Sequence, residues 1–398
     1  MKVLKAFKFE LRPTGEQLRQ MSQFAGCCRH VFNRALGLQL KSREAGEKMA
    51  YYSALSAQIK TLRRDPNKLW LSKAPFHSLQ KSIKNLDTGW KNHFESLKKL
   101  KAGLIKPHQV VEIPSFKKKG VHDSFQFPDK KQFKVDEGNE RIFLPKLGWI
   151  RYRKSRTLQG VMRSATVSRR AQQWFVSILV EYDIGERVTK ATSAVGIDMG
   201  IKRFATFNDG SFIAPINSLK RFQKRLAHAQ RGAKRCKKFS KNWKKVQQKV
   251  STIHARIANV RADYLHKATH EISKNHALIC IENLQIRNMS KSAKGTVEKP
   301  GKKVKQKSGL NKAILDQGWG EFRRQLEYKT TWYGSTLIAV PAHHTSQTCP
   351  ACSHVSRDNR LTQALFACVS CGYENNADVV GAINILGLGQ RSLNCGGD

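Results

Sequence analysis

The sequence has few acidic residues for its length, so its charge is strongly one-sided. Its 398 residues include 29 Asp and Glu against 73 Lys and Arg, which gives a formal net charge of +44. Such an excess of positive charge repels itself unless a polyanion neutralises it. Nucleic acid is therefore the expected partner, and a basic protein of a membrane surface or of the ribosome is the weaker interpretation.

Long hydrophobic runs are also missing. No stretch approaches the roughly 18 apolar residues that indicate a transmembrane helix. The chain starts at Met1 directly in an alternating, strand-like pattern, so we expect no signal peptide and no membrane partner. Hydrophobic residues make up 40% of the chain, which is enough to form two or three folded domains. We expect a cytoplasmic protein that associates with the nucleoid.

Four of the nine cysteines form two CxxC pairs, and the other five show no pairing rhythm. Cys349 and Cys352 are followed, after 15 residues, by Cys368 and Cys371. This spacing is typical of a tetrahedral zinc site, because four thiolates satisfy Zn²⁺ and its filled d shell imposes no other geometry. The sequence therefore predicts one structural zinc ion.

The first half of the chain changes from strand-like to helical patterns and back again. Residues 1–15 alternate as a first strand, and residues 16–108 have the apolar periodicity of helices. Short strand-like runs separated by turn residues occupy 109–185. We interpret this half as a β-barrel-like module that a helical insertion interrupts near its start.

A second domain is predicted over 194–342. It begins with a buried strand, a glycine turn and a second strand, and continues with a basic helical region over 216–274. That region holds 17 Lys and Arg against two acids, so contact with a phosphate backbone is favoured over a merely solvated helical hairpin. The Lys-, Gly- and Ser-rich segment 286–313 is expected to form a lid loop.

The last part of the chain combines the cysteines with a final helix. We expect a zinc ribbon over 343–374 that binds nucleic acid, and the end of the second domain over 375–398. The predicted fold class is thus α+β and multidomain.

Three isolated carboxylates border apolar runs. Asp198 ends the first buried strand of the second domain, Glu282 follows the apolar run that ends at Ile281, and Asp378 precedes the last helix. A charge beside a buried strand must be paired or must bind a metal. Taken singly, the three also fit a turn residue, a surface acid and a helix N-cap. Their order of strand–Asp–hairpin, helices, strand–Glu and Asp–helix is the layout of an RNase H-like α/β nuclease core.

This layout predicts a site for two Mg²⁺ ions. Two such ions about 3.5–4 Å apart stabilise the attacking and leaving oxygens of a phosphoryl displacement, and Mg²⁺ prefers carboxylate oxygens. We predict that Asp198 bridges the two ions. Glu282 would hold the ion that activates water, and Asp378 would lie on the leaving-group side.

Four segments resemble the TnpB (OrfB) proteins that transposons encode. They are VGIDMGIK at 195–202, IENL at 281–284, TSQTCPAC at 345–352 and the residues from Cys371 to Ile385, and weaker similarity covers almost the whole chain. One departure is Val380-Gly381, where the family usually has Asn-Ala. The resemblance implies a wedge β-barrel with a helical recognition insertion, followed by a RuvC-type nuclease domain into which the zinc ribbon is inserted.

The resemblance also implies a function and its partners. TnpB proteins are similar to type V CRISPR nucleases, so a guide RNA and target double-stranded DNA are expected in a monomeric ribonucleoprotein. Base pairing then reads the target, and the protein reads a short motif beside it. Tyr52, Ser56 and Gln80 resemble the motif-reading residues of the family, and Gln80 is favoured because glutamine can read an adenine in the major groove. A solvated helix face is the plain alternative for each of the three.

Other functions fit parts of the same pattern. A catalytically silent RNA-guided DNA-binding repressor would lack the carboxylates, whereas all three are present here. A transposase that joins DNA strands would use the same metal site, so the carboxylates alone do not separate it from a nuclease. A zinc-ribbon RNA-binding protein without catalysis is the third alternative. The sequence favours an RNA-guided, Mg²⁺-dependent DNA endonuclease.

Overall fold

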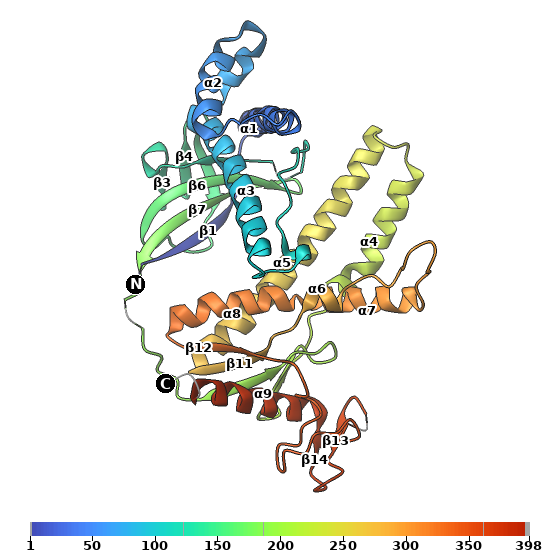
Figure 1. Cartoon of the computed structure of the whole chain (residues 1–398). Coiled ribbons are helices and arrows are strands. Elements are labelled where there is room, and N and C mark those ends of the chain that lie inside the picture. The colour runs from blue at the N-terminus through green and yellow to red at the C-terminus, as the bar shows by residue number, and fades with distance from the viewer. Residues whose placement is uncertain (1, 122, 186, 361, 395–398) are drawn as a thin grey trace. The chain divides into compact units, whose positions relative to one another are not determined.

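The computed structural model describes residues 2–121, 123–185, 187–360 and 362–394, which form two compact units (Figure 1). Unit 1 extends from Met1 to Asp183 and unit 2 from Ile184 to Asp398. The boundary between them follows the last strand of the strand-rich segment that the sequence indicates. Among the described residues, no helix is long and apolar enough to cross a membrane.

Unit 1 is built on a curled, seven-stranded antiparallel sheet in the order β2-β6-β7-β1-β5-β4-β3. Its strands are β1 (Lys2–Arg12), β2 (Ser124–Phe127), β3 (Lys134–Asp136), β4 (Arg141–Leu144), β5 (Gly148–Arg153), β6 (Val161–Arg170) and β7 (Gln173–Asp183). The first strand of the chain lies in the middle of the sheet, because β1 pairs with β7 along one edge and with β5 along the other. No described pairing joins β2 to β3, so the curled sheet stays open between these two strands, and the β-barrel-like wedge stays a prediction.

The expected helical insertion lies between β1 and β2. It contains α1 (Gly15–Glu44), α2 (Tyr52–Arg64), the 3₁₀ helix η1 (Pro66–Lys73), α3 (Phe76–Lys101) and the short 3₁₀ turn η2 (Pro107–Gln109). A further 3₁₀ turn, η3 (Lys130–Gln132), lies between β2 and β3. Thr14 begins α1 with a capping box, in which its side chain accepts a hydrogen bond from the Gln17 amide and the Gln17 side chain accepts one from the Thr14 amide. The buried Trp90 of α3 donates to Gln39 of α1, which satisfies two polar groups inside the core.

Unit 2 contains a five-stranded sheet in the order β10-β9-β8-β11-β12. The strands are β8 (Ala194–Asp198), β9 (Ala205–Phe207), β10 (Phe212–Ile213), β11 (Leu278–Glu282) and β12 (Thr336–Val340). β8 and β9 form the antiparallel hairpin that the sequence predicts, whereas β11 is parallel to both β8 and β12. Ile197 pairs with Ile281, so the residues that follow them, Asp198 and Glu282, end neighbouring parallel strands at the same edge.

The helices of unit 2 include the long basic hairpin that the sequence predicts. They are α4 (Ser218–Arg235), α5 (Lys241–Asn275), α6 (Ile286–Met289), α7 (Val304–Gln317), α8 (Trp319–Tyr333) and α9 (Ala377–Asn394). In Figure 1 the α4–α5 hairpin projects from the sheet of unit 2. The four-cysteine segment forms a small ribbon whose strands, β13 (Leu365–Ala367) and β14 (Glu374–Asn376), are antiparallel and lead directly into α9.

The prediction that residues 286–313 form a lid loop is wrong in part, because helices occupy both ends of this segment. Helix α6 occupies its start, and helix α7 begins at Val304, so only residues 290–303 lie outside helices. Two side chains of α7 hold this segment, because Lys307 donates to the Met289 carbonyl and Asn311 donates to the Ser290 carbonyl. These tertiary contacts stabilise a helix in a segment whose Lys, Gly and Ser content favours a loop.

Helix α9 packs directly on strand β8 at Gly196. A Cβ atom at this position would lie 2.1 Å from the Ala382 carbonyl oxygen and 2.8 Å from the Leu386 Cβ. Real Cβ atoms do not approach other atoms so closely, and the nearest obstacle is backbone that cannot rotate away. Gly196 therefore sets the distance between the strand that ends at Asp198 and the helix that carries Asp378.

We predict that Gly196→Ala lowers the free energy of unfolding by about 2–4 kcal/mol, because α9 must move away from β8. Chemical denaturation followed by circular dichroism measures this change. Gly387→Ala, on an open face of the same helix where an added Cβ meets nothing within 4 Å, is the control and should be neutral or stabilising. Equal stability of the Gly196→Ala variant and the wild type would contradict the packing argument.

Candidate functional site

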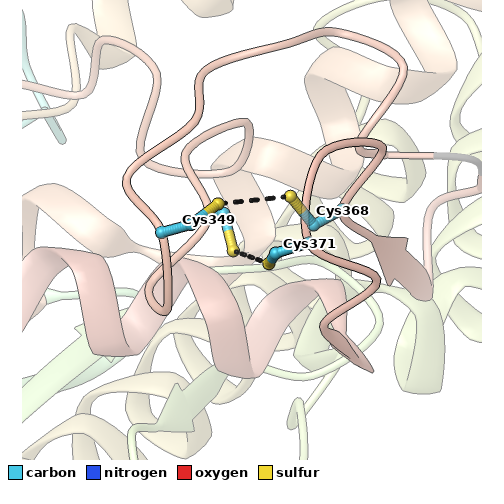
Figure 2. A group of neighbouring side chains, drawn as sticks. Cys349, Cys368 and Cys371 are labelled. Carbon is cyan, nitrogen blue, oxygen red and sulfur yellow. Dashed lines mark hydrogen bonds between the residues drawn. The ribbon is translucent and has the colours of Figure 1, made fainter.

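The four cysteines of the ribbon converge as the CxxC spacing predicts. Their sulfur atoms all lie within 4.8 Å of one another, and the Cys349–Cys371 and Cys352–Cys368 sulfurs are each 3.6 Å apart. Figure 2 shows the labelled Cys349, Cys368 and Cys371 arranged around one point. Sulfur atoms bound tetrahedrally at about 2.3 Å from a zinc ion lie about 3.8 Å apart, so the cluster fits such an ion.

A buried asparagine organises the ribbon around these cysteines. Asn359 is fully buried, and its side chain donates hydrogen bonds to the carbonyls of Gln347 and His354. The same side chain accepts a hydrogen bond from the Val369 amide, beside Cys368. Hydrogen bonds from Asn359 thus connect the two CxxC turns, which are far apart in the chain. This connection does not require a bound metal.

The three isolated carboxylates lie near enough to one another, at one edge of the unit 2 sheet, for the charges of Glu282 and Asp378 to act on Asp198. Asp198 and Glu282 end the adjacent strands β8 and β11, and Asp378 lies in the first turn of α9. A Cβ on Gly381, one turn further along α9, would lie 3.5 Å from the Asp198 side chain, so this helix lies against that carboxylate. Each of the three side chains is partly exposed. The structure therefore brings together all three acids that the sequence singles out, while their role as metal ligands stays a prediction.

Burial and like charge act together on Asp198. Burial is the larger cause, and the negative charges of Glu282 and Asp378 add to it, so the pKa of Asp198 is raised to about 7. Burial also raises the pKa of Glu282, against the effect of a hydrogen bond from Thr345 and of the Arg360 charge. Carboxylates that repel one another in this way are stabilised by a cation among them, which makes the site suitable for a divalent metal ion.

Thr345 orients the Glu282 side chain. The sequence motifs assign no role to Thr345. Its hydroxyl group donates a 2.6 Å hydrogen bond to Glu282 Oε1, and the residue is buried. Thr345 is itself fixed by α9, because Asn384 donates 2.8 Å hydrogen bonds to the carbonyls of Thr345 and Thr348. Thr348 directly precedes Cys349, so the entry to the ribbon is tied both to Glu282 and to the helix of Asp378.

The ribbon also brings a positive charge to the acidic site. Arg360 lies 3.9 Å from Asp378 Oδ1, and its charge opposes the rise in the pKa of both Asp198 and Glu282. Its neighbour in the chain is the buried Asn359, which fixes the backbone at this point. No motif in the sequence distinguishes Arg360 from the many other basic residues, so only the structure associates it with the site.

Asp378 is not the N-cap of α9, which corrects the plain interpretation of this residue. The helix begins at Ala377, and Asn376 lies at the cap position, where its side chain accepts a 3.0 Å hydrogen bond from the Asp378 amide. The carboxylate of Asp378 therefore remains available for other interactions. Asn376 ends strand β14, so the ribbon also determines where the first turn of α9 starts.

Tyr52, Ser56 and Gln80, which resemble motif-reading residues, lie on facing helices of unit 1. Tyr52 and Ser56 are on α2, and Gln80 on α3 donates a 3.0 Å hydrogen bond to the Ser56 hydroxyl. Ser56 is only 8% exposed, and the Tyr52 amide donates to Asp87. Of the three, Gln80 keeps its carbonyl oxygen free of any described hydrogen bond. Their role in reading DNA stays a prediction.

Fold and site define an α+β protein in which a four-cysteine ribbon is combined with an acidic site at the edge of a partly parallel sheet. Family models match three parts of the chain: "Helix-turn-helix domain" over residues 1–48, "Probable transposase" of the OrfB family over 177–293, and "Cas12f1-like, TNB domain" over 319–385. The described residues of the first range form β1 and the single helix α1, with α2 beginning only at Tyr52.

Relatives cover the whole chain. The chain is 47% identical over 396 residues to "Putative RNA-guided DNA endonuclease InsQ" of Escherichia coli (strain K12), covering 100% of this chain and 95% of that protein. It is 31% identical over 399 residues to a "Putative RNA-guided DNA endonuclease" of Streptomyces pristinaespiralis, covering 99% and 91%. The chain belongs to the TnpB (OrfB) family of transposon-encoded proteins.

A solved structure supports the fold. The chain is similar to the protein in a cryo-EM structure of a Cas12f1–sgRNA–target DNA complex, with a TM-score of 0.52 and 15% identity, over 96% of this chain and 98% of that one. At this low identity the likeness concerns the fold alone.

The raised pKa of Asp198 leads to a prediction about stability. A carboxyl whose pKa is raised from 3.8 to about 7 by folding destabilises the folded state progressively as the pH rises through this range, and fully above it. In chelator-treated protein at pH 8, Asp198→Asn should therefore raise the free energy of unfolding by on the order of 2–4 kcal/mol. The gain should shrink toward pH 4. Denaturation curves at both pH values measure it, and an equal gain at pH 4 and pH 8 would contradict the ionisation argument.

The hydrogen bond from Thr345 leads to a second prediction. Thr345→Val keeps the shape of the side chain but removes the donor to Glu282, so divalent metal binding should weaken by about 10- to 100-fold. Mn²⁺ titration followed by electron paramagnetic resonance measures this affinity without requiring catalysis. Thr345→Ser restores the hydroxyl group and should bind Mn²⁺ nearly as the wild type does. Equal affinities of the Val and Ser variants would show that Thr345 does not act through Glu282.

Proposed function

We propose that this protein is an RNA-guided DNA endonuclease associated with a transposable element. A guide RNA selects the target, a short motif beside the target licenses its opening, and the double-stranded DNA is cleaved by Mg²⁺-dependent hydrolysis. The observation that carries this proposal is the meeting of Asp198, Glu282 and Asp378 at one sheet edge, beside a four-cysteine ribbon. The full-length relatives named as RNA-guided DNA endonucleases support it.

Asp198, Glu282 and Asp378 would hold the catalytic metal. Bound Mg²⁺ ions supply the positive charge that stabilises the attacking and leaving oxygens of the scissile phosphate. Asp198 feels the charges of both other carboxylates, so it suits the bridging position between two ions. Glu282 is oriented by Thr345, and Asp378 is placed by the Asn376 cap. Arg360, whose guanidinium group lies 3.9 Å from Asp378, would pair with a phosphate oxygen of the bound strand.

The four cysteines would hold one structural zinc ion. Their sulfur spacing and the absence of histidine or carboxylate from the cluster, as far as the structure describes the chain, fit a closed, non-catalytic site. The zinc would stabilise the ribbon from which Thr345, Arg360 and Asn376 reach the acidic site. We infer that the zinc ion acts on cleavage through these residues and not through contact with the substrate phosphate.

Unit 1 would act as the wedge and recognition module. Its curled sheet and inserted helices fit the arrangement expected for the family, with the wedge assigned to 1–15 and 109–185 and the recognition insertion to 16–108. Gln80 would read the motif beside the target through the free side of its amide, while Ser56 supports it by a hydrogen bond. Tyr52, at the start of α2, would belong to the same motif-reading group.

The alternatives make different predictions. A silent repressor has no reason to keep three mutually repelling carboxylates together, which argues against it. The name of the OrfB family model favours a transposase, whereas the names of the relatives favour a nuclease. Strand-joined products would identify the transposase. A ribbon that only binds RNA would give no Mg²⁺-dependent products at all.

The test uses the full-length protein purified with its RNA. Sequencing of the copurified RNA identifies the guide, and a target library is then incubated with the ribonucleoprotein and Mg²⁺. We expect double-strand cuts at a fixed distance from one motif, and Asp198→Ala should reduce cleavage at least about 100-fold while DNA binding persists. Undiminished cleavage by Asp198→Ala would exclude the proposed site. Cys371→Ser tests the ribbon, since it should lose zinc and cleavage together.

A further inference from the structure

The tip of the α4–α5 hairpin carries an exposed aromatic ring that the nuclease chemistry does not use. Phe239 lies in the five-residue turn between the two helices and is 65% exposed. Its ring lies 5.3 Å from the Trp243 ring, centroid to centroid and in a T-shaped arrangement, and the Lys238 ammonium nitrogen lies 5.3 Å from the centroid of the Phe239 ring. The apolar residues that join α4 to α5, Phe222, Leu226 and Ile257, form a separate cluster further along the hairpin. Phe239 therefore adds nothing to the hairpin core.

The backbone at Phe239 is held in a conformation that phenylalanine rarely adopts. Its φ is +68°, in the left-handed region where glycine or asparagine is usual and where a bulky side chain costs about 1 kcal/mol or more. The next residue, Ser240, caps α5 by accepting a hydrogen bond from the Trp243 amide, which fixes the turn. A strained, preformed turn that presents an aromatic ring to solvent indicates a ligand for that ring.

The charge around this ring identifies the kind of ligand. Seven exposed basic residues lie in the turn or in the adjoining ends of α4 and α5: Lys234, Arg235, Lys237, Lys238, Lys241, Lys244 and Lys245. The chain has no Asp or Glu between Asp209 and Asp263, and none of the seven forms an ion pair with a described residue. An open groove of about 580 Å³ at the same end of the hairpin is lined by Lys234, Lys238 and Trp243, among others, but not by Phe239 itself. Positive charge combined with an open aromatic platform is the arrangement that binds single-stranded nucleic acid.

We propose that the hairpin tip binds an unpaired segment of the guide RNA, with a base stacked on Phe239 and the flanking phosphates held by the surrounding lysines. This inference rests on the proposed function. RNA is favoured over DNA because stacking needs a base that is already unpaired, as in RNA loops and ends, whereas the bases of duplex DNA become free only after the guide has opened the duplex. The turn at the hairpin tip already has its conformation in the protein without nucleic acid. It therefore suits the guide RNA, which binds before the target DNA is opened.

A glycine substitution separates this role from folding. Phe239→Gly removes the ring and relieves the strained backbone, so the thermal midpoint should be no lower than that of the wild type. Affinity for the copurified RNA, resynthesised and measured by filter binding to the full-length protein, should fall by about ten-fold, the loss expected for one stacked base. Phe239→Tyr keeps an aromatic face and should retain affinity within about three-fold, and Phe239→Leu should behave like the glycine variant.

A matched control and a crosslink complete the test. Phe212→Ala removes an aromatic ring that is 52% exposed elsewhere in unit 2 and should leave RNA affinity unchanged. RNA transcribed with 4-thiouridine should crosslink to the peptide that contains Phe239 before any DNA is added. Replacing Lys237 and Lys238 by Gln should lower the slope of log affinity against log salt by about 1–2.

Several outcomes would overturn the proposal. Unchanged RNA affinity of Phe239→Gly, or crosslinks from this peptide only to target DNA carrying 4-thiothymidine, would show that the tip does not bind RNA. Equal losses in Phe239→Gly and Phe212→Ala would show a non-specific effect. Failure of any RNA to copurify with the wild-type protein would instead overturn the proposed function, so the two failures are distinguishable.

Discussion

Burial and mutual repulsion both oppose the placement of three carboxylates at one edge of the unit 2 sheet. Asp198 carries the largest part of this cost, since its pKa is raised to about 7 by its surroundings. The close packing of α9 on β8 at Gly196 nevertheless forces Asp378 toward Asp198, and the parallel pairing of β8 with β11 forces Glu282 to the same edge. The placement of these carboxylates lowers the free energy of unfolding, and in the proposed function bound metal ions would offset this loss by neutralising the negative charge. Functional sites commonly store strain of this kind.

The four-cysteine ribbon contributes more to the acidic site than its position in the chain suggests. It contributes the hydroxyl group that orients Glu282, the cap that places Asp378 and the Arg360 guanidinium group, which lies 3.9 Å from Asp378. Asn384 ties the ribbon entry back to α9, so both sides of the acidic site depend on the same short segment. The four-cysteine cluster and the acidic site are thereby linked through protein hydrogen bonds, in the way that outer-shell residues often link a metal site to its scaffold.

The basic residues of the chain fall into groups that differ in their surroundings and in the partners they suit. Most of the Lys and Arg residues that the structure describes are at least partly exposed, which suits long contacts with phosphate backbones whose strength depends on salt. Arg360 is different, because it is placed against carboxylates inside the site. The cations around Phe239 are different again, because they surround an aromatic ring and together favour an unpaired base over a uniform duplex.

The sequence by itself determined the features that depend on local pattern. The two CxxC turns predicted the cysteine cluster, because each turn brings its own pair of sulfurs together. Periodicity predicted the β8–β9 hairpin and the helices of unit 1, and isolated acids beside apolar runs pointed to Asp198, Glu282 and Asp378. Only the tertiary structure decided that the unit 1 sheet is open, that α7 replaces part of a loop, and that Thr345 and Arg360 reach the acidic site. The physical reason is that these features depend on contacts between residues far apart in the chain, such as Thr345 and Glu282, and such contacts leave no periodic trace in the sequence.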